Sequence, residues 1–261
     1  MIKYYDKQNK CLVYIDTGAN GAFWDSIWNV DNFEELVKIK NNPFIIDNTK
    51  RYLPTGSRIL EGGCGRGDKV YALYSHGYDV YGVDYAKETI KKINRCVPEI
   101  KVTYGDVRKL DFEDGFFDGY WSLGVIEHFY NGYDEIINEM YRVLKHGGVL
   151  FMTVPSMSCI RKFKAKVGRY PQYLENEEMV KNFYQFVLNP KQVIKKFENK
   201  GFKLLEIRKI EGVYGVSNEV NFLGRVFQYL YNSNTLAIRK MTEIIANTFA
   251  NHLSFYIMKR I

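Results

Sequence analysis

The sequence predicts an α/β fold built on a doubly wound, mostly parallel sheet. Between residues 58 and 155, short apolar segments alternate with amphipathic ones, which is typical of strand–helix–strand units with right-handed crossovers. A glycine cluster at 62–67 separates the first strand from the first helix, and Asp84 ends the second strand. Ligands of such folds bind at the carboxyl ends of the strands, so we expect the functional site there.

The elements of this region can be assigned in order along the chain. Each predicted strand is a short apolar run, and the predicted helices show one apolar face or end near glycine. Strands are predicted at 58–61, 79–84, 101–104, 117–122 and 149–154, and helices at 69–76, 87–96 and 134–145. With its loops, this region forms an expected cofactor-binding core at 54–155 within a single domain, residues 1–261.

The segment before this core predicts an N-terminal helical cap. Residues 1–53 are rich in aromatic residues and Asn and show no strand alternation. Asp31, with Glu34 three residues later, has the pattern of a capping box and predicts a helix at 31–40. A second helix is expected between two prolines, Pro43 and Pro54.

Two segments follow the core. Residues 156–189 are polar and basic and are interpreted as a substrate lid. The C-terminal part, 190–261, is expected to hold a helix at 190–199, a strand at 202–210, two helices within a late insertion at about 219–250, and a last strand at 253–258.

The composition limits the class of protein. The chain has 261 residues, of which 46% are hydrophobic, and carries 37 Lys+Arg against 30 Asp+Glu, a net charge of +7. These proportions favour a globular core over a disordered chain. Basic and acidic residues are interspersed, so a nucleic-acid partner is not expected. The four cysteines form no C-x-x-C pair, which argues against a zinc ribbon or a thioredoxin motif, and no metal is expected.

The location expected for the chain is cytoplasmic. Nothing in the cysteine spacing suggests a disulfide framework, and no apolar core follows the first charged residues as in a signal peptide. No run approaches the roughly 18 apolar residues of a membrane span, although peripheral contact with a membrane remains open. The oligomeric state is not predicted.

The glycine loop predicts a nucleoside site. Glycines between a strand and a helix allow a sharp turn and a close approach of the backbone to a ligand. Asp84 lies 21 positions after Gly63, where a carboxylate can accept both hydroxyls of a ribose. The spacing is not the G-x-G-x-x-G of dinucleotide folds, and Asp68 stands where a phosphate-binding loop has lysine.

Five segments in order resemble the motifs of class I S-adenosylmethionine-dependent methyltransferases, in the small-molecule branch often called type 11. The segments are Ile59–Gly67, Gly82–Asp84, Gly105–Val107, Trp121–His128 and Tyr141–Leu150. One departure is Gly62, where an aliphatic residue is commoner in the family. The resemblance implies a Rossmann-like, seven-stranded sheet whose last strand is antiparallel, with S-adenosyl-L-methionine as the cofactor.

The resemblance also implies which residues bind this cofactor. Glu61 and the backbone of Gly63, Cys64 and Gly65 would hold its methionine part. The other cofactor-binding residues would be Asp84 at the ribose, Tyr85 beside it, Asp106 and Val107 at the adenine, and Leu123 near the amino-acid end. Trp24 and Trp28 lie four residues apart and would share a helix face. They are interpreted either as a lid over the cofactor or as a stripe that packs the cap onto the sheet.

The catalytic candidates are His128 and Glu127. Methyl transfer from a sulfonium mainly needs alignment and a dry pocket, and a base helps when the nucleophile is a hydroxyl. His128 follows the fourth strand, and its ordinary pKa of about 6.5 suits a general base. Glu127 would orient His128 or contact the cofactor. The alternative interpretation is that both residues only cap a helix and line the pocket.

The acceptor is predicted only as a class. Residues 161–169 carry five positive charges and no acid, which favours either an anionic acceptor or a solvated basic lid. The 219–250 insertion would contact a lipid-like substrate or a dimer partner, or else pack on the sheet. Ser122–Val125 stands where base and glutamine methyltransferases have an acid or Asn followed by Pro-Pro-aromatic, so those reactions are not expected.

The predicted function is therefore methyl transfer to a small molecule, a glycan or a lipid intermediate. Three alternatives stay open: a nicotinamide-dependent reductase, a non-catalytic S-adenosylmethionine-binding protein and, less strongly, an RNA methyltransferase.

Overall fold

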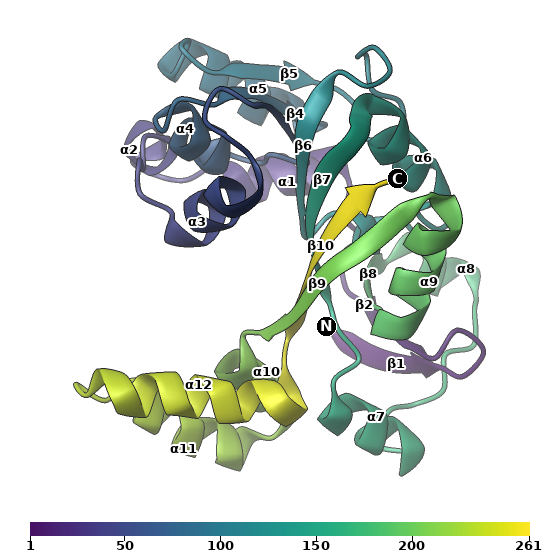
Figure 1. The fold of residues 1–261 in the computed structure, drawn as a ribbon. Helices are drawn as coiled ribbons and strands as arrows, with labels where there is room; N and C mark the ends of the chain where they lie inside the picture. Colours follow the sequence, from purple (N-terminus) through teal and green to yellow (C-terminus); the bar gives the residue numbers. More distant parts are fainter.

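The computed structural model describes residues 1–261 and is built on a seven-stranded sheet (Figure 1). Its strands lie in the order β5-β4-β3-β6-β7-β10-β9. Their bounds are β3 Arg58–Gly62, β4 Asp79–Asp84, β5 Lys101–Tyr104, β6 Phe117–Leu123, β7 Leu144–Pro155, β9 Phe202–Ile210 and β10 Leu253–Arg260. β10 is antiparallel to both of its neighbours, whereas β3 to β7 are parallel. The predicted fold class, including the antiparallel last strand, is confirmed.

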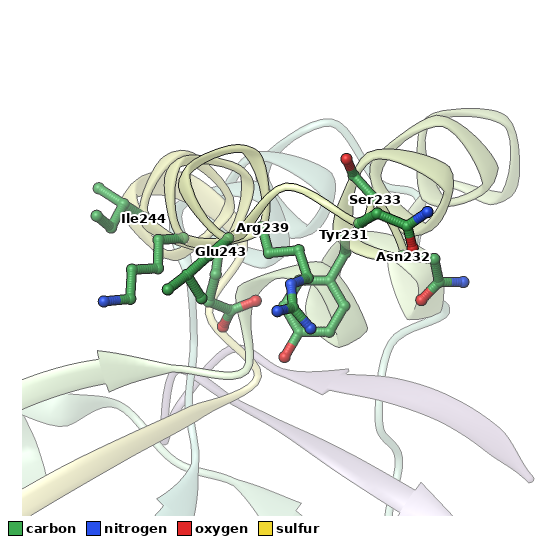
Figure 2. A pocket seen from close by; sticks show the side chains of 9 residues that line it. Tyr231, Asn232, Ser233, Arg239, Glu243 and Ile244 are labelled. Atoms are coloured by element: carbon green, nitrogen blue, oxygen red, sulfur yellow. The ribbon is translucent and has the colours of Figure 1, made fainter.

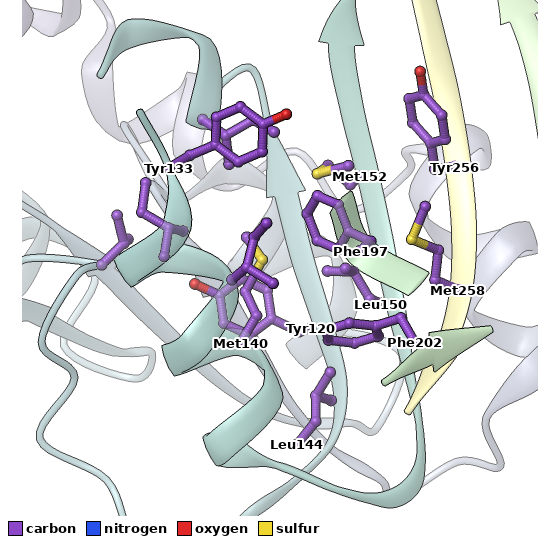
Figure 3. Packing of buried hydrophobic residues seen from close by; sticks show 14 of the residues in the cluster. Tyr120, Tyr133, Met140, Leu144, Leu150, Met152, Phe197, Phe202, Tyr256 and Met258 are labelled. Carbon is purple, nitrogen blue, oxygen red and sulfur yellow. The ribbon is translucent and has the colours of Figure 1, made fainter. Parts of the chain in front are cut away.

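Alternating residues of the central strands face two different cores. On one face, α6 (Asp134–Val143) and α9 (Pro190–Lys200) pack against residues such as Tyr120 of β6 (Figure 3). On the other face, α4 (Asp68–Tyr74) and α5 (Lys87–Cys96) pack with Trp121. Successive side chains of a strand point to opposite sides, so Tyr120 and Trp121 anchor different layers and the sheet is buried on both faces.

The N-terminal segment differs from the prediction because it begins with a hairpin. β1 (Ile2–Asp6) pairs with β2 (Cys11–Ile15), and β2 pairs with β8 (Phe183–Val187) in a separate three-stranded antiparallel sheet. The prediction that 1–53 contains no strand is therefore wrong. Four of the five residues of β2 are buried, so polar and apolar residues do not alternate along the strand. Its partner β8 lies about 170 positions later in the sequence, where no local pattern predicts the pairing.

Three short helices follow this hairpin: α1 (Gly21–Trp28), α2 (Phe33–Val37) and α3 (Pro43–Tyr52). The helix expected between the two prolines is present as α3. Asp31 is not the N-cap of α2, because that position belongs to Asn32, which has a φ of 55° and makes no side-chain capping bond. The left-handed turn at Asn32 starts the helix one residue later than the capping-box pattern indicates.

The two helices predicted within 219–250 are present as α11 (Asn221–Tyr231) and α12 (Leu236–Ala250). A third helix, α10 (Gly212–Glu219), precedes them and was not predicted. The three helices project away from the sheet instead of packing on it (Figure 1). The helices pack mainly on each other. Gly212 and Gly215 let α10 approach α12 closely, because a Cβ atom at these positions would lie only 2.3 Å and 1.7 Å from backbone atoms of α12. The glycines allow a backbone-to-backbone contact that replaces packing on the sheet.

The basic 161–169 segment is partly structural. It begins in α7 (Cys159–Lys166) and precedes α8 (Glu177–Lys181). The side chains of Arg161 and Glu219 are both 0% exposed and are paired at 3.1 Å, and Lys164 lies 2.6 Å from the same carboxylate. Two of the five cations therefore neutralise Glu219 at the end of α10. No helix of the structure has the length and apolar character that a bilayer span requires.

Candidate functional site

The candidate site lies where β3, β4 and β6 end. The parallel register places Gly62 beside Val83, and the amide of Gly63 donates to the carbonyl of Val83 at 2.8 Å. The glycine loop therefore begins beside Asp84, the last residue of β4. Leu123 ends β6 at the same edge of the sheet. This edge is where the alternation of strands and helices predicts a ligand site.

The glycine loop is shaped for close contact. Gly63 and Gly65 have φ values of +78° and +50°, which other residues rarely adopt. A Cβ at Gly63 would lie 2.4 Å from Val125, and one at Gly65 would lie 2.9 Å from the ring of Trp28. Side chains of α1 and of the segment after β6 thus press directly on the loop.

The departure at Gly62 has a structural compensation. A Cβ at Gly62 would lie 2.0 Å from the hydroxyl oxygen of Tyr120, which comes from the neighbouring strand β6. Tyr120 is fully buried, and its ring fills the space that a side chain at 62 would occupy. The glycine therefore accommodates a large aromatic residue in the core and does not leave a void.

Asp84 holds the loop in place. One carboxylate oxygen accepts from the amide of Gly65 at 2.8 Å, and the other accepts from the amide of Ala86 at 2.9 Å. Burial raises the pKa of Asp84, while these amide donors lower it. Each carboxylate oxygen has a second lone pair, so Asp84 can also accept hydroxyl groups from a ligand.

Two buried glutamates lie at the site, where burial favours their protonated forms. Burial raises the pKa of Glu61 and of Glu127 to about 8. In each of them Oε2 is buried and has no hydrogen-bond partner in the protein. Unpartnered buried oxygens are rare, and they fit a site that a polar ligand completes. Glu127 makes no hydrogen bond to His128, so it does not orient that residue as predicted.

His128 is oriented by β8 instead. It ends a single 3₁₀ turn, Ile126–His128, and its Nδ1 lies 2.7 Å from the carbonyl oxygen of Tyr184. The ring of Tyr184 also packs edge-on at 5.1 Å. Burial lowers the pKa of His128 to about 4, although the bond to the carbonyl opposes this shift. The imidazole is therefore neutral at pH 7, and its Nε2 is free of bonds within the protein.

Helix α1 brings both of its tryptophans to the site. Trp24 and Trp28 stack with ring centroids 6.1 Å apart, and Trp24 packs edge-on against His128 at 5.0 Å. The helix is fixed to the start of α5, where Asp25 accepts from the amide and the hydroxyl of Thr89, both at 2.8 Å. Both tryptophans therefore line the site.

The site consists of two adjoining cavities. The first has a volume of about 60 Å³ and is lined by Trp24, Trp28, Gly63, Asp84, Tyr85, Leu123, Gly124, Val125, His128 and Phe129. The second has a volume of about 570 Å³ and includes Asp106, Arg108, Tyr130 and Asn131. Tyr85, His128 and Phe129 line both cavities. His128 therefore stands at the junction of a small aromatic space and a wider polar one.

Some predicted residues lie outside both cavities. The Cys64 side chain packs toward Gly82, and Val107 belongs to the buried core. Asp106 lines the wider cavity, but its carboxylate is held by the Arg108 guanidinium at 2.6 Å, a contact that lowers its pKa. Glu61, Gly65 and Glu127 lie behind the cavity walls.

Sequence reasoning missed other lining residues. Gly124 and Val125 follow Leu123 directly and Phe129 follows His128, so their place in the chain was a usable signal. Tyr184, which orients His128, carries no such signal, because its contact spans 56 positions.

Comparison with known proteins agrees with this geometry. Residues 60–152 match the model of a methyltransferase domain of type 11. A probable S-adenosylmethionine-dependent methyltransferase of Mycolicibacterium smegmatis is 29% identical over 101 residues, which cover 39% of each chain. The chain thus spans well under half the length of that relative. Demethylmenaquinone methyltransferase of Staphylococcus aureus is 27% identical over 207 residues, 72% of this chain and 84% of that one.

Solved structures show the same fold. The crystal structure of the [4+2]-cyclase SpnF superposes with a TM-score of 0.59 and 15% identity, covering 95% of this chain and 98% of the cyclase. The order of the motifs, the sheet, the site at its carboxyl edge and these likenesses agree. Residues 60–152 therefore form a methyltransferase domain of the class I S-adenosylmethionine-dependent type.

Proposed function

We propose that this protein transfers a methyl group from S-adenosyl-L-methionine to a small molecule that bears an acidic hydroxyl group, with His128 as the general base. The position of His128 carries this proposal. Its Nδ1 faces the carbonyl of Tyr184, and its Nε2 is free at the junction of the two cavities. A neutral imidazole in this state accepts a proton from a nucleophile.

The residues of the site fit the cofactor. Gly63 and Gly65 leave a backbone surface that a Cβ would fill, and the unpartnered oxygen of Glu61 lies behind it. When bound, S-adenosylmethionine supplies a methyl group that is already activated on a sulfonium. In our proposal Asp84 accepts the ribose hydroxyls and Glu61 stabilises the methionine part. Asp106 stands at the adenine end of the wider cavity.

The aromatic lid would contribute in two ways. The faces of Trp24 and Trp28 attract a sulfonium cation, and their bulk excludes water from the reacting atoms. The aromatic cavity of about 60 Å³ is much smaller than the roughly 300 Å³ of an ordinary ligand site. Trp28 covers Gly65, so it has to move when the cofactor enters. We infer that α1 opens and closes over the glycine loop.

The pKa of His128 narrows the acceptor class. Because burial lowers this pKa to about 4, the imidazole is a weak base and removes a proton efficiently only from an acidic hydroxyl. Phenols, hydroquinones and enols have such hydroxyls, whereas sugars and aliphatic alcohols do not. The named activity of the Staphylococcus aureus relative, on demethylmenaquinone, fits this class when that acceptor is in its reduced, hydroquinone form. A lipid intermediate with such a hydroxyl therefore fits the proposed acceptor class better than a glycan does.

An anionic acceptor receives less support than the sequence suggested. Arg161 and Lys164 of the basic segment are paired with Glu219, which leaves Lys162, Lys166 and Arg169 exposed. None of these residues lines either cavity of the site. We therefore propose that the acceptor is selected by its hydroxyl and its apolar body, not by a negative charge.

A methyl-transfer assay tests the proposal. S-adenosylhomocysteine formation is measured with demethylmenaquinol, a simple phenol and a sugar as acceptors, using the wild type and His128→Ala. We expect turnover with the first or second acceptor only, and loss of that turnover in the variant. Turnover with the sugar alone, or equal rates in both proteins, would overturn the proposal.

A further inference from the structure

The projecting α11–α12 pair exposes an unusual amount of apolar surface. Phe222 is 75% exposed, Tyr229 80%, Met241 62% and Ile244 64%. These residues lie on two consecutive helices, and nothing else in the chain covers them. Isolated exposed apolar residues are ordinary, but several large ones on two consecutive helices indicate an interaction surface.

This surface is not the inner face of a loosely packed core. The inner residues of the helical lobe are Val213, Val216, Ala246 and Ala250, which pack together and are buried. The lobe extends away from the sheet, at the end of the molecule opposite β5 (Figure 1). Its outer face therefore meets solvent or a partner, while the cofactor site stays free.

The charges on the same helices have one sign. Arg225, Arg239 and Lys240 are exposed. The one acid of α11 and α12 is Glu243, whose carboxylate accepts from the amides of Gly212 at 2.7 Å and Val213 at 3.2 Å. No exposed carboxylate on these helices offsets the three cations. The surface is thus both apolar and positively charged.

A cavity at the turn between the two helices strengthens the polar part of this surface. It has a volume of about 760 Å³ and includes Tyr231, Arg239 and Lys240. Figure 2 shows the side chains of Tyr231, Arg239 and Glu243 converging on it. Arg and Lys beside a tyrosine hydroxyl can donate to the oxygens of a phosphate headgroup.

We propose that the α11–α12 face binds the surface of an anionic lipid bilayer. Exposed aromatic and aliphatic residues enter the boundary between headgroups and acyl chains, and the cations meet the lipid phosphates. A second copy of the chain fits less well, because it would bring three cations against three. Helix α7, which contacts α12, lies at the same end of the molecule and adds exposed Lys162 and Lys166 (Figure 1).

Vesicle binding tests the proposal. The full chain is sedimented with phosphatidylcholine vesicles that contain or lack about a third phosphatidylglycerol, without cofactor or acceptor, so the result is separate from that of methyl transfer. We expect binding to the anionic vesicles only. Phe222→Ser with Tyr229→Ser should weaken it at least about tenfold. Replacing Arg225, Arg239 and Lys240 by Gln should also weaken it at least about tenfold.

Matched control variants distinguish binding through this surface from nonspecific apolar or electrostatic binding to vesicles. Tyr74→Ser removes an exposed aromatic residue from α4, and replacing Lys50, Lys191 and Lys195 by Gln removes three exposed cations from other elements. Both should bind vesicles like the wild type. Equal losses in the test and control variants, or no binding at all, would overturn the proposal.

A fluorescent reporter tests insertion directly. Tyr229→Trp places an indole on the surface, and Tyr74→Trp places one elsewhere. We expect a blue shift with anionic vesicles for the first protein only. The same shift in both proteins contradicts insertion. Sedimentation velocity completes the test, since a dimer that Tyr229→Ser dissociates would assign this face to self-association and overturn the proposal.

Discussion

The Nδ1 atom of His128 lies 2.7 Å from the carbonyl oxygen of Tyr184, which belongs to the small second sheet. A carbonyl oxygen only accepts hydrogen bonds, so the ring proton is assigned to Nδ1 and the lone pair to Nε2. The carbonyl group of Tyr184 in the second sheet therefore sets the tautomer of His128, which follows β6 of the main sheet.

Replacing His128 should remove catalysis and keep the cofactor. For His128→Ala we expect kcat to fall roughly 10²- to 10⁴-fold, the usual contribution of a general base. The Kd for S-adenosylhomocysteine should stay within about threefold, measured by calorimetry. His76→Ala is the control, because His76 lies at the end of α4 and bonds only to the Ala72 carbonyl. A large loss of cofactor affinity in His128→Ala would mean that His128 is part of the binding site instead.

The pH dependence should reflect a weak base. The pKa of His128 is about 4 in the folded protein, against 6.5 for the free side chain. The acid limb of kcat/KM should therefore fall near pH 4. An acid limb near pH 6.5 would refute this.

The lowered pKa of His128 should also make the free energy of unfolding depend on pH. The unfolded chain binds the His128 proton between about pH 6.5 and 4 and the folded chain does not, so the free energy of unfolding decreases as the pH falls through that window. Urea titrations of wild type and His128→Ala at several pH values should show that the variant loses this part of the dependence.

Asp84 should control cofactor affinity. Asp84→Ala removes acceptors for the ribose and for the amides of Gly65 and Ala86, so we expect S-adenosylhomocysteine to bind roughly 10- to 150-fold more weakly. Asp79→Ala, at the other end of β4, is the matched control and should bind normally. Titration with NAD runs beside both. Unchanged affinity in Asp84→Ala would mean that the ribose is held elsewhere, and binding of NAD would contradict the predicted cofactor.

The contact between Gly65 and Trp28 predicts a coupling between two substitutions. Gly65→Ala forces a side chain into a left-handed conformation, at about 1–2 kcal/mol, and into the Trp28 ring 2.9 Å away. Adding Trp28→Ala should remove the clash with the ring and leave the backbone strain at residue 65. Urea unfolding of the two single variants and the double variant measures this coupling. Strict additivity would show that Trp28 does not rest on the loop in solution.

Replacing Glu219 should strongly reduce the free energy of unfolding. Burial opposes its ionisation, but hydrogen bonds from Lys164 and Tyr170 and the charge of Arg161 hold the pKa of Glu219 at about 2. Glu219→Gln leaves Arg161 buried without a counter-charge, so we expect a loss of about 3–5 kcal/mol in urea unfolding. Glu88→Gln, which breaks the exposed pair with Lys91, should cost less than about 1 kcal/mol.

The sequence by itself determined the core and the class of cofactor. The order of strands and helices from 58 to 155, the glycines that need positive φ, and Asp84 at the end of β4 are local features. Each depends on residues close together in the chain, so a pattern of spacing is enough to predict them. The carboxyl ends of parallel strands then meet by geometry alone, which placed the predicted site at one edge of the sheet.

Tertiary structure decided the rest. β2 is buried and finds β8 about 170 positions later, the carbonyl of Tyr184 fixes His128, and Glu219 collects the charges of Arg161 and Lys164. The α11–α12 face is apolar like a core helix, yet it is exposed because α10 and α12 pack through glycines. Local patterns indicate which faces are apolar. Which apolar face meets which partner depends on contacts between distant segments, and these exist only after the chain has folded.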